Sequence, residues 1–367
     1  MQLKVCILGA GPAGFALAAD LSSRGTNVLI YSHPTHPRHA NNVLSKGHLK
    51  SHGAIKGITL VHITFSIHEA VEFSKILILT VPSTGQSTIL HELKPFALHH
   101  HTIIAVPGNL FSLIANAEIE VGHILETNIS PYSCRMSDEG ELTVFGKKNS
   151  ISIAALHKPG NPRTYLSTNS SSFKAKIQRI FPQRLQWCTN VIEVSLSNIN
   201  GVFHPLMILM NAGRIESTHG DFLLYKHGLT RSVANAIQAV DKVRLEIGSA
   251  FGFNLDSVIE TSNLCYGANF TDLVDLAQNS KPHMKLKAPS GIENRNVSED
   301  VPDLLVCWFG LAGKLGIDAR AVGAVVGLAC MATGVDYLGE GRNLRNLHLE
   351  GLGREELLER FSVKRGK

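Results

Sequence analysis

The stretch Leu3-Lys-Val-Cys-Ile-Leu-Gly-Ala-Gly-Pro-Ala-Gly14 decides the fold of the first part of the chain. A short apolar run leads into three glycines, and the alanine-rich segment 15–25 continues with helical spacing. In a dinucleotide-binding turn these glycines permit the tight turn, the close approach of a pyrophosphate and the packing of the helix on the strand. The alternative is a structural glycine turn in an unrelated α/β domain. The residues expected to hold the cofactor are Gly9, Gly11, Pro12, Ala13 and Gly14.

The residues after the second apolar run, 27–31, bear on which dinucleotide is bound. An acidic residue at the end of this strand would hold the ribose hydroxyls of NAD. Ser32 stands there instead, with His33 and Arg38 close behind it. A hydroxyl and basic side chains suit the 2′-phosphate of NADP, which an acid would repel. We therefore expect NADP(H). The alternatives are NAD(H), or a loop whose polar side chains face only solvent.

Further apolar runs end in polar residues that we expect at the carboxyl edge of the same sheet. One run ends in Thr80, Val81 and Pro82, which we place near the nicotinamide. Another ends in Glu126 and Thr127, which either hold a substrate amino group or hydroxyl, or simply terminate a strand. After it, 144–146 and 151–156 are interpreted as a β-hairpin.

Three adjacent histidines at 99–101 do not predict a metal site. Neighbouring side chains on one short stretch cannot easily converge on a single ion, and no second cluster of ligands is evident. We interpret them as part of a solvated loop and expect no bound metal.

The composition of the 367-residue chain excludes several classes of protein. Its net charge of +5 comes without a run of lysine and arginine, so we expect no nucleic-acid partner. None of the apolar runs reaches the roughly 18 residues of a membrane helix, and the first residues do not resemble a signal peptide. Six cysteines without a Cys-x-x-Cys pair suit reduced thiols in a cytoplasmic protein.

The hydrophobic pattern of the sequence changes near residue 190, where helical periodicity replaces short apolar runs. We therefore predict an α/β fold class with two domains: a Rossmann-type dinucleotide-binding domain at 1–187 and an all-α domain at 188–367. A long polar loop at 281–302, framed by prolines, interrupts the helices of the second domain. Loops of this length in compact domains are often functional.

Two stretches of the second domain offer residues for acid–base chemistry. Asn200 and His204 stand four residues apart, so they share one face if the segment is helical. Pro205 either kinks that helix or begins a new one. The loop supplies Arg295 and Asp300, so an imidazole, a carboxylate, a guanidinium and an amide are available to protonate and anchor a small carboxylic substrate. Taken alone, His204 is better interpreted as a satisfied core histidine, and only the joint presence of the other three residues favours a site.

Several motifs match a known family: the glycine turn 9–14 and the segments 126–135, 196–205, 211–213, 225–228, 287–289 and 295–302. With these motifs the chain resembles, over nearly its whole length, the opine dehydrogenases of the octopine/nopaline type. The resemblance implies that His204 and Asp300 form the proton-transfer dyad, that Arg295 binds the carboxylate of the keto acid, and that Asn200 supports the substrate. Asn296 departs from the family, which commonly has tyrosine there. Asn109, Glu126 and Thr127 are our further candidates for substrate contacts.

The reaction that the resemblance implies is an NAD(P)H-dependent reductive condensation. An amino acid and an α-keto acid, such as pyruvate or 2-oxoglutarate, form an imine that is reduced to a secondary amine. We expect the dyad to face the nicotinamide across a cleft, and the assembly we consider is a homodimer. The alternatives are a ketopantoate-reductase-like or 2-hydroxyacid dehydrogenase, which needs no amine, and a non-catalytic NADP-binding sensor.

Overall fold

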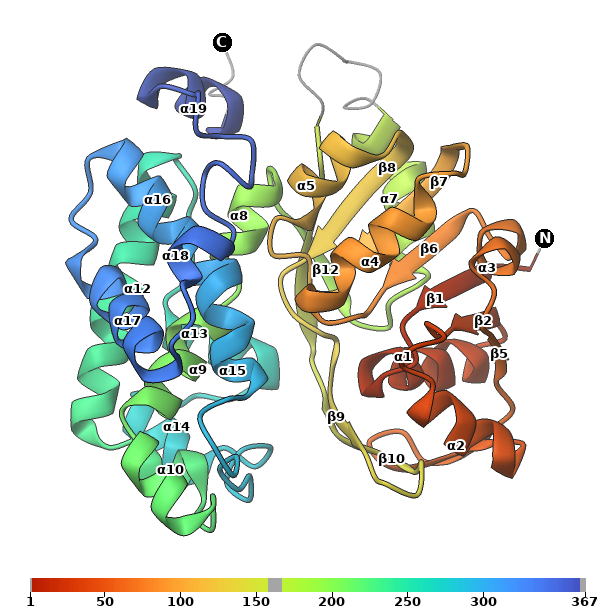
Figure 1. Cartoon of the computed structure of the whole chain (residues 1–367), viewed down its shortest axis with the longest axis horizontal. Coiled ribbons are helices and arrows are strands. Elements are labelled where there is room, and N and C mark those ends of the chain that lie inside the picture. The colour runs from red at the N-terminus through yellow and green to blue at the C-terminus, as the bar shows by residue number, and fades with distance from the viewer. Residues whose placement is uncertain (1, 158–166, 364–367) are drawn as a thin grey trace. The chain divides into compact units, whose positions relative to one another are not determined.

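The computed structural model describes residues 2–157 and 167–363. The chain divides into two compact units, Met1–Val191 and Ile192–Lys367 (Figure 1). Each unit is described by itself. No helix among the described residues is long and apolar enough to cross a membrane.

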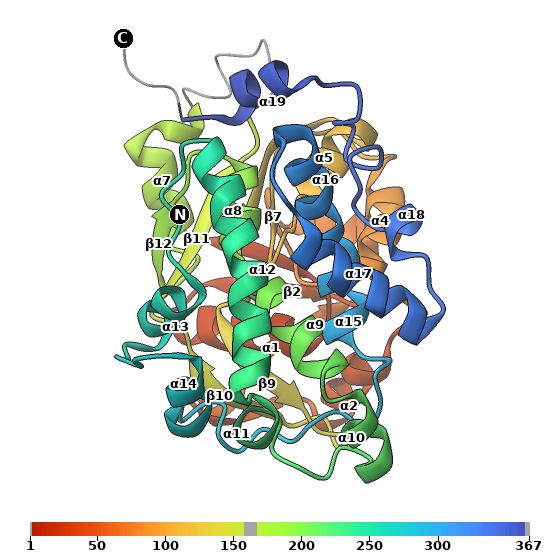
Figure 2. The ribbon, with the colours of Figure 1, turned by 90° about the vertical axis from the view of Figure 1, so that its left-hand side faces the viewer.

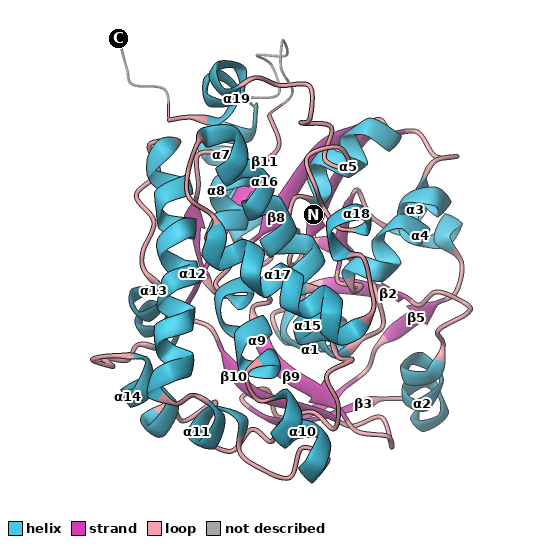
Figure 3. Ribbon diagram, turned by 60° about the vertical axis from the view of Figure 1, so that its left-hand side comes forward, coloured by secondary structure: helices cyan, strands magenta, loops and turns pink. Residues whose placement is uncertain are grey.

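The first unit is built on an eight-stranded sheet with the order β12-β11-β8-β7-β6-β1-β2-β5. Strands are drawn in magenta in Figure 3. The six strands from β8 to β5 are all parallel to one another, which is the arrangement of a Rossmann-type sheet. This fold class, predicted from the glycine turn, is confirmed. The strands are β1 (Lys4–Leu8), β2 (Asn27–Tyr31), β5 (His62–Thr64), β6 (Ile76–Leu79), β7 (Leu98–Ala105), β8 (Val121–Thr127), β11 (Ser150–Ala155) and β12 (Arg184–Trp187).

The central strands carry the core of this unit because they are apolar on both faces. Residues 5–8 of β1 are fully buried, as expected for a parallel strand covered on both sides. The helices that connect the strands are α1 (Pro12–Ser23), α2 (Arg38–Lys46), α3 (Ile67–Phe73), α4 (Ser83–Leu93), α5 (Phe111–Glu118) and α7 (Ser171–Gln178).

A second, four-stranded sheet has the order β4-β3-β10-β9. Its strands are β3 (Leu49–Gly53), β4 (Gly57–Thr59), β9 (Tyr132–Met136) and β10 (Leu142–Lys147). The predicted hairpin of 144–146 with 151–156 is wrong. β10 pairs with β9 and β3, whereas β11 pairs with β8 and β12 in the main sheet. Each segment is extended, as predicted, but the pattern of a strand does not say which strand is its partner.

The second unit is helical, as predicted, and its described part contains only one isolated bridge between extended residues, Leu223 with Lys287. Figure 2 shows the long helix α12 running through it. The helices are α8 (Val191–Leu196), α9 (Asn200–Leu209), α10 (Ala212–Thr218), α11 (Leu224–Gly228), α12 (Arg231–Ala250), α13 (Val258–Tyr266), α14 (Leu273–Asn279), α15 (Arg295–Ser298), the π-helix η1 (Val301–Leu305), α16 (Val306–Leu315), α17 (Arg320–Thr333), α18 (Tyr337–Glu340) and α19 (Arg354–Phe361).

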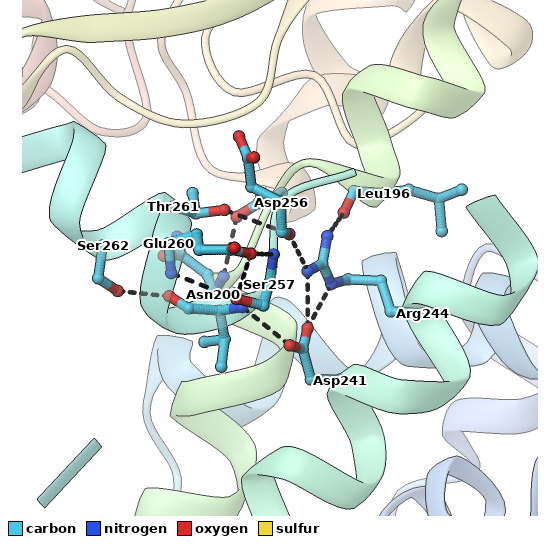
Figure 4. A network of polar contacts seen from close by, with 11 residues as sticks. Leu196, Asn200, Asp241, Arg244, Asp256, Ser257, Glu260, Thr261 and Ser262 are labelled. Atoms are coloured by element: carbon cyan, nitrogen blue, oxygen red, sulfur yellow. Dashed lines mark hydrogen bonds and ion pairs between the residues drawn. The ribbon is translucent and has the colours of Figure 1, made fainter. Parts of the chain in front are cut away.

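A buried ion pair on α12 ties three of these helices together (Figure 4). The Arg244 side chain is fully buried and donates at 2.7 Å to the Asp241 carboxylate, to the carbonyl of Leu196 and to the carbonyl of Asp256. Asp241 in turn accepts the backbone N–H of Val258 at 2.8 Å. Because these partners satisfy both charges, the pair is tolerated in the interior. It fixes the end of α8 and the start of α13 to α12.

We expect Arg244→Ala to lower the free energy of unfolding of the second unit by about 3–5 kcal/mol, because the Asp241 carboxylate would be left buried and unpaired. Lys242→Ala is the matched control on the same helix, since Lys242 pairs with Glu246 on the surface and such pairs contribute at most about 1 kcal/mol. Urea unfolding followed by the fluorescence of buried Trp308, in a Trp187→Phe background, isolates this unit. Equal losses in the two variants would contradict the prediction.

Candidate active site

The turn between β1 and α1 has a geometry that only glycine allows at two positions. Gly9 has a φ of +131°, and a Cβ there would lie 2.7 Å from Thr80 Oγ1. A Cβ on Gly14 would lie 2.0 Å from the carbonyl oxygen of Gly9. At Gly11, by contrast, a Cβ would meet no described atom within 4 Å. The backbone at Gly11 is therefore open to close approach by a phosphate.

The start of α1 fits the same ligand. The helix begins at Pro12 and Ala13, and no side chain caps its N-terminus. The amides of a first helical turn and the positive end of the helix dipole bind phosphate groups. The residues of this turn therefore fit the pyrophosphate of a dinucleotide.

The loop after β6 is attached to the turn. The Thr80 hydroxyl donates to the carbonyl of Gly9 at 3.1 Å, and the Val81 side chain lies close to the same glycine. Pro82 then precedes the first residue of α4. The structure therefore brings Thr80, Val81 and Pro82 to the glycine turn.

The end of β2 carries a buried hydroxyl that fits a ribose. Ser32 is only 1% exposed, and its Oγ has no hydrogen-bond partner among the described residues. A buried hydroxyl without a partner is costly, and a bound ribose or phosphate would supply one. Arg38 is exposed at the start of α2 and forms an ion pair with Asp138, which a ligand phosphate would have to displace.

An acid does reach the end of β2, but it comes from α4. Glu92 accepts the Tyr31 hydroxyl at 2.7 Å, and its other oxygen lies 3.4 Å from His33 Nε2. His33 Nδ1 is 2.7 Å from the Thr35 hydroxyl. His33 is therefore held by protein groups. No sequence pattern near Tyr31 pointed to Glu92, because it lies some sixty positions later in the chain.

Glu126 and Thr127 have structural partners in the first unit. The fully buried Glu126 carboxylate accepts the backbone N–H groups of Leu110 and Ser112, both at 2.7 Å, at the start of α5. The Thr127 hydroxyl donates to the carbonyl of Ile129 at 3.1 Å. Of the two interpretations left open for this pair, the contacts favour a structural one. Asn109 is buried beside them, just before α5, with a φ of +52°.

The three histidines lie in strand β7, not in the solvated loop that we expected. His99 and His100 are exposed, whereas His101 is buried with Nε2 3.1 Å from the carbonyl of Val71. Burial lowers the pKa of His101. No group of three or more His, Cys, Asp or Glu within the described ranges is placed to hold a metal ion.

His204 and Asp300 meet in the second unit although 96 residues separate them in the chain. The distance from His204 Nδ1 to Asp300 Oδ2 is 2.6 Å, in the range of a charge-assisted hydrogen bond. The side chain of Asp300 is 10% exposed and that of His204 is 26% exposed. No described residue hydrogen-bonds to His204 Nε2. A carboxylate on Nδ1 fixes the imidazole tautomer and leaves Nε2 to exchange a proton with a ligand.

Gly201 makes this approach possible. A Cβ at Gly201 would lie 3.0 Å from the Leu304 side chain and 3.1 Å from that of Trp308, so a larger residue would push α9 away from η1 and α16. Helix α9 continues through Pro205 instead of ending there. The glycine thus lets the helix that carries His204 pack against the segment that begins at Asp300.

Asn200 and Arg295 lie on the two elements that supply the pair. Asn200 is the first residue of α9, one helical turn from His204. Arg295 begins α15 with a side chain that is 74% exposed, and its Nη2 is 3.6 Å from Glu299. Sequence reasoning missed Glu299, which stands next to Asp300. Its pKa is raised mainly by burial, although Arg295 opposes that rise.

Both parts of the chain are similar in sequence to domains of known dehydrogenases. Residues 187–333 match the alpha-helical domain of NAD/NADP octopine/nopaline dehydrogenase, and residues 4–111 match the N-terminus of NAD-dependent glycerol-3-phosphate dehydrogenase. Vitopine synthase of Allorhizobium ampelinum is 27% identical over 356 residues, which cover 95% of this chain and 96% of the relative.

Two solved structures are similar over almost the full length. Octopine dehydrogenase with NADH and L-arginine has a TM-score of 0.74 at 16% identity, and the match covers 100% of both chains. Yersinopine dehydrogenase with NADP⁺ bound has a TM-score of 0.67 at 16% identity and 98% coverage of both. At these identities the structures show a shared fold.

Proposed function

We propose that this chain is an opine dehydrogenase, which condenses an amino acid with an α-keto acid in an NAD(P)H-dependent reduction. The observation that carries the proposal is the 2.6 Å contact between His204 and Asp300, which leaves one imidazole nitrogen for proton transfer. The product is a secondary amine that joins the carbon skeletons of the two substrates.

The chemistry needs a proton carrier and a hydride donor. The amine attacks the keto carbonyl, water leaves, and an imine results. The nicotinamide, when bound, supplies the hydride that reduces the imine carbon. His204 Nε2 gives or accepts the proton that accompanies these steps, while Asp300 orients the ring and stabilises its charged form.

Arg295 is the proposed anchor for the carboxylate of the keto acid. Its guanidinium is exposed, and at 3.6 Å its contact with Glu299 is long enough to be exchanged for a bidentate pair with a ligand. Asn200, on the same face of α9 as His204, is the proposed supporting contact. Anchoring the carboxylate holds the reacting carbon in one place, which lowers the entropic cost of the reaction.

NADP(H) is the proposed cofactor, while the family resemblance itself supports either dinucleotide. The proposal is supported by Ser32, which stands where an acid would repel a 2′-phosphate, and by the exposed Arg38. Glu92 opposes it, because this carboxylate already holds His33. We therefore assign the recognition of the phosphate to Ser32 and Arg38, with His33 in a supporting role.

The decisive assay measures NADPH and NADH oxidation with a matrix of amino acids against pyruvate, 2-oxoglutarate and glyoxylate. We expect oxidation only when an amine and a keto acid are both present, because the hydride acceptor is their imine. Oxidation with a keto acid alone would favour the hydroxyacid dehydrogenase alternative. Tight NADPH binding without turnover in any combination would favour the sensor.

His204→Ala should lower kcat by about 10²- to 10⁴-fold, the usual contribution of a general acid–base group. The affinity for NADPH, measured by fluorescence titration, should stay unchanged because the glycine turn belongs to the other unit. His100→Ala, which removes an exposed imidazole from β7, is the control and should keep full activity. Normal turnover of His204→Ala would refute the role assigned to this residue.

Ser32→Asp should move the preference from NADPH toward NADH, because a carboxylate at the end of β2 repels a 2′-phosphate and accepts hydrogen bonds from ribose hydroxyls. We expect the ratio of kcat/KM for NADPH over NADH to fall at least about tenfold, which corresponds to about 1.4 kcal/mol. Ser66→Asp, at the cap of α3, adds the same charge elsewhere in the unit. A wild-type enzyme that prefers NADH would contradict the cofactor proposal.

A further inference from the structure

We propose that Tyr225 is a further substrate-binding residue, whose hydroxyl donates a hydrogen bond to a carboxylate or carbonyl oxygen of the substrate bound at the His204–Asp300 pair. This inference rests on the proposed function and extends it. Neither sequence motifs nor the reasoning about acid–base groups assigned a role to this tyrosine.

The first observation is a hydroxyl that has no protein partner and is open to a ligand. Tyr225, in α11, is only 7% exposed, and no described residue hydrogen-bonds to its hydroxyl. The hydroxyl oxygen is nevertheless not one of the fully buried polar atoms that lack a partner, so it lies where solvent or a ligand can reach it. The ring is buried like that of a phenylalanine, and the hydroxyl is free to donate to a ligand oxygen in place of water.

The second observation is the position of the ring beside the pair. The ring centroid of Tyr225 is 6.3 Å from that of Phe203, the residue before His204 in α9. The Asp300 carboxylate is close enough to act on the tyrosine electrostatically. Tyr225 and the pair therefore belong to one site within the second unit.

The third observation is that the ring is held in place. Its other neighbour is the imidazole of His283, stacked at 4.4 Å with an angle of 28° between the planes. That imidazole is itself fixed, with Nδ1 2.7 Å from the Ser280 hydroxyl and Nε2 3.4 Å from the Tyr266 hydroxyl. A side chain fixed by such packing can present its hydroxyl to a ligand without losing further rotational freedom.

The charge of the hydroxyl suits an anionic ligand. Burial first, and the Asp300 carboxylate second, raise the pKa of Tyr225 above its usual range. The phenol therefore keeps its proton at neutral pH and can donate a hydrogen bond. A neutral donor next to Asp300 attracts a substrate oxygen without adding a second negative charge.

The stoichiometry of the proposed reaction calls for such a donor. The amino acid and the keto acid each bring a carboxylate, and Arg295 is assigned to one of them. A second donor from α11 would hold the remaining carboxylate or the keto oxygen. Which of these oxygens it binds is decided by which Michaelis constant responds when the hydroxyl is removed.

Tyr225→Phe removes only the hydroxyl and keeps the stacked ring. We expect kcat/KM to fall about 10- to 100-fold for the amino acid or for the keto acid, as for a hydrogen bond to a charged group. A larger rise in KM for one substrate identifies its oxygen as the acceptor. The KM for NAD(P)H and the midpoint of thermal unfolding should not change, because no protein group loses a partner.

The experiment has a negative and a positive control. Tyr132→Phe removes a hydroxyl from β9 in the first unit, where no described residue hydrogen-bonds to it, and should leave kcat/KM within about threefold. Arg295→Ala should raise the KM for the keto acid and shows that the assay detects a lost carboxylate contact.

The inference and the proposed function fail in different ways. An active wild type whose Tyr225→Phe variant is unchanged would overturn the role of Tyr225 and leave the proposed function intact. A Tyr225→Phe variant that loses thermal stability and affinity for NAD(P)H together with activity would show that Tyr225 has a structural role. That result would also overturn the proposed role in substrate binding. A wild type without amine-dependent turnover would overturn both.

Discussion

The short contact between His204 and Asp300 is the interaction on which the candidate site depends. An imidazole and a carboxylate at 2.6 Å tolerate little displacement, so the helices that carry them must pack closely. Gly201 provides the close packing, because any side chain there would meet Leu304 and Trp308. Arg244 fixes the preceding helix, α8, and the start of α13 to α12. The acid–base pair is therefore supported by glycine packing and by a fully buried charge.

The first unit depends on a similar constraint. Gly9 and Gly14 are required because Thr80 and the carbonyl of Gly9 lie where a Cβ would stand. The same closeness leaves the backbone at Gly11 open, which suits a pyrophosphate. Both units thus use glycine to bring backbone into positions that a side chain would forbid, in one case for a ligand and in the other for a neighbouring helix.

Residues of one type have different roles here because their surroundings differ. Glu126 has both oxygens bound to backbone amides at the start of α5, so it stabilises that helix. Glu92 holds Tyr31 and His33 at the end of β2, where it bears on the choice of cofactor. Glu299 lies beside Asp300 with a pKa raised by burial. Asp300 is oriented toward an imidazole. The role of each carboxylate follows from the groups it contacts, and residue type alone does not distinguish these roles.

The sequence by itself determined the Rossmann-type sheet, the helical second unit and the residue types of the acid–base pair. Glycine spacing and hydrophobic periodicity report local backbone geometry and burial, and both are local properties. Only the tertiary structure decided that β10 and β11 belong to different sheets, that Glu126 binds the start of α5, and that Glu92 reaches the end of β2. It also decided that the ring of Tyr225 is buried. These facts depend on contacts between segments far apart in the chain, and packing selects such contacts after the local pattern has been satisfied.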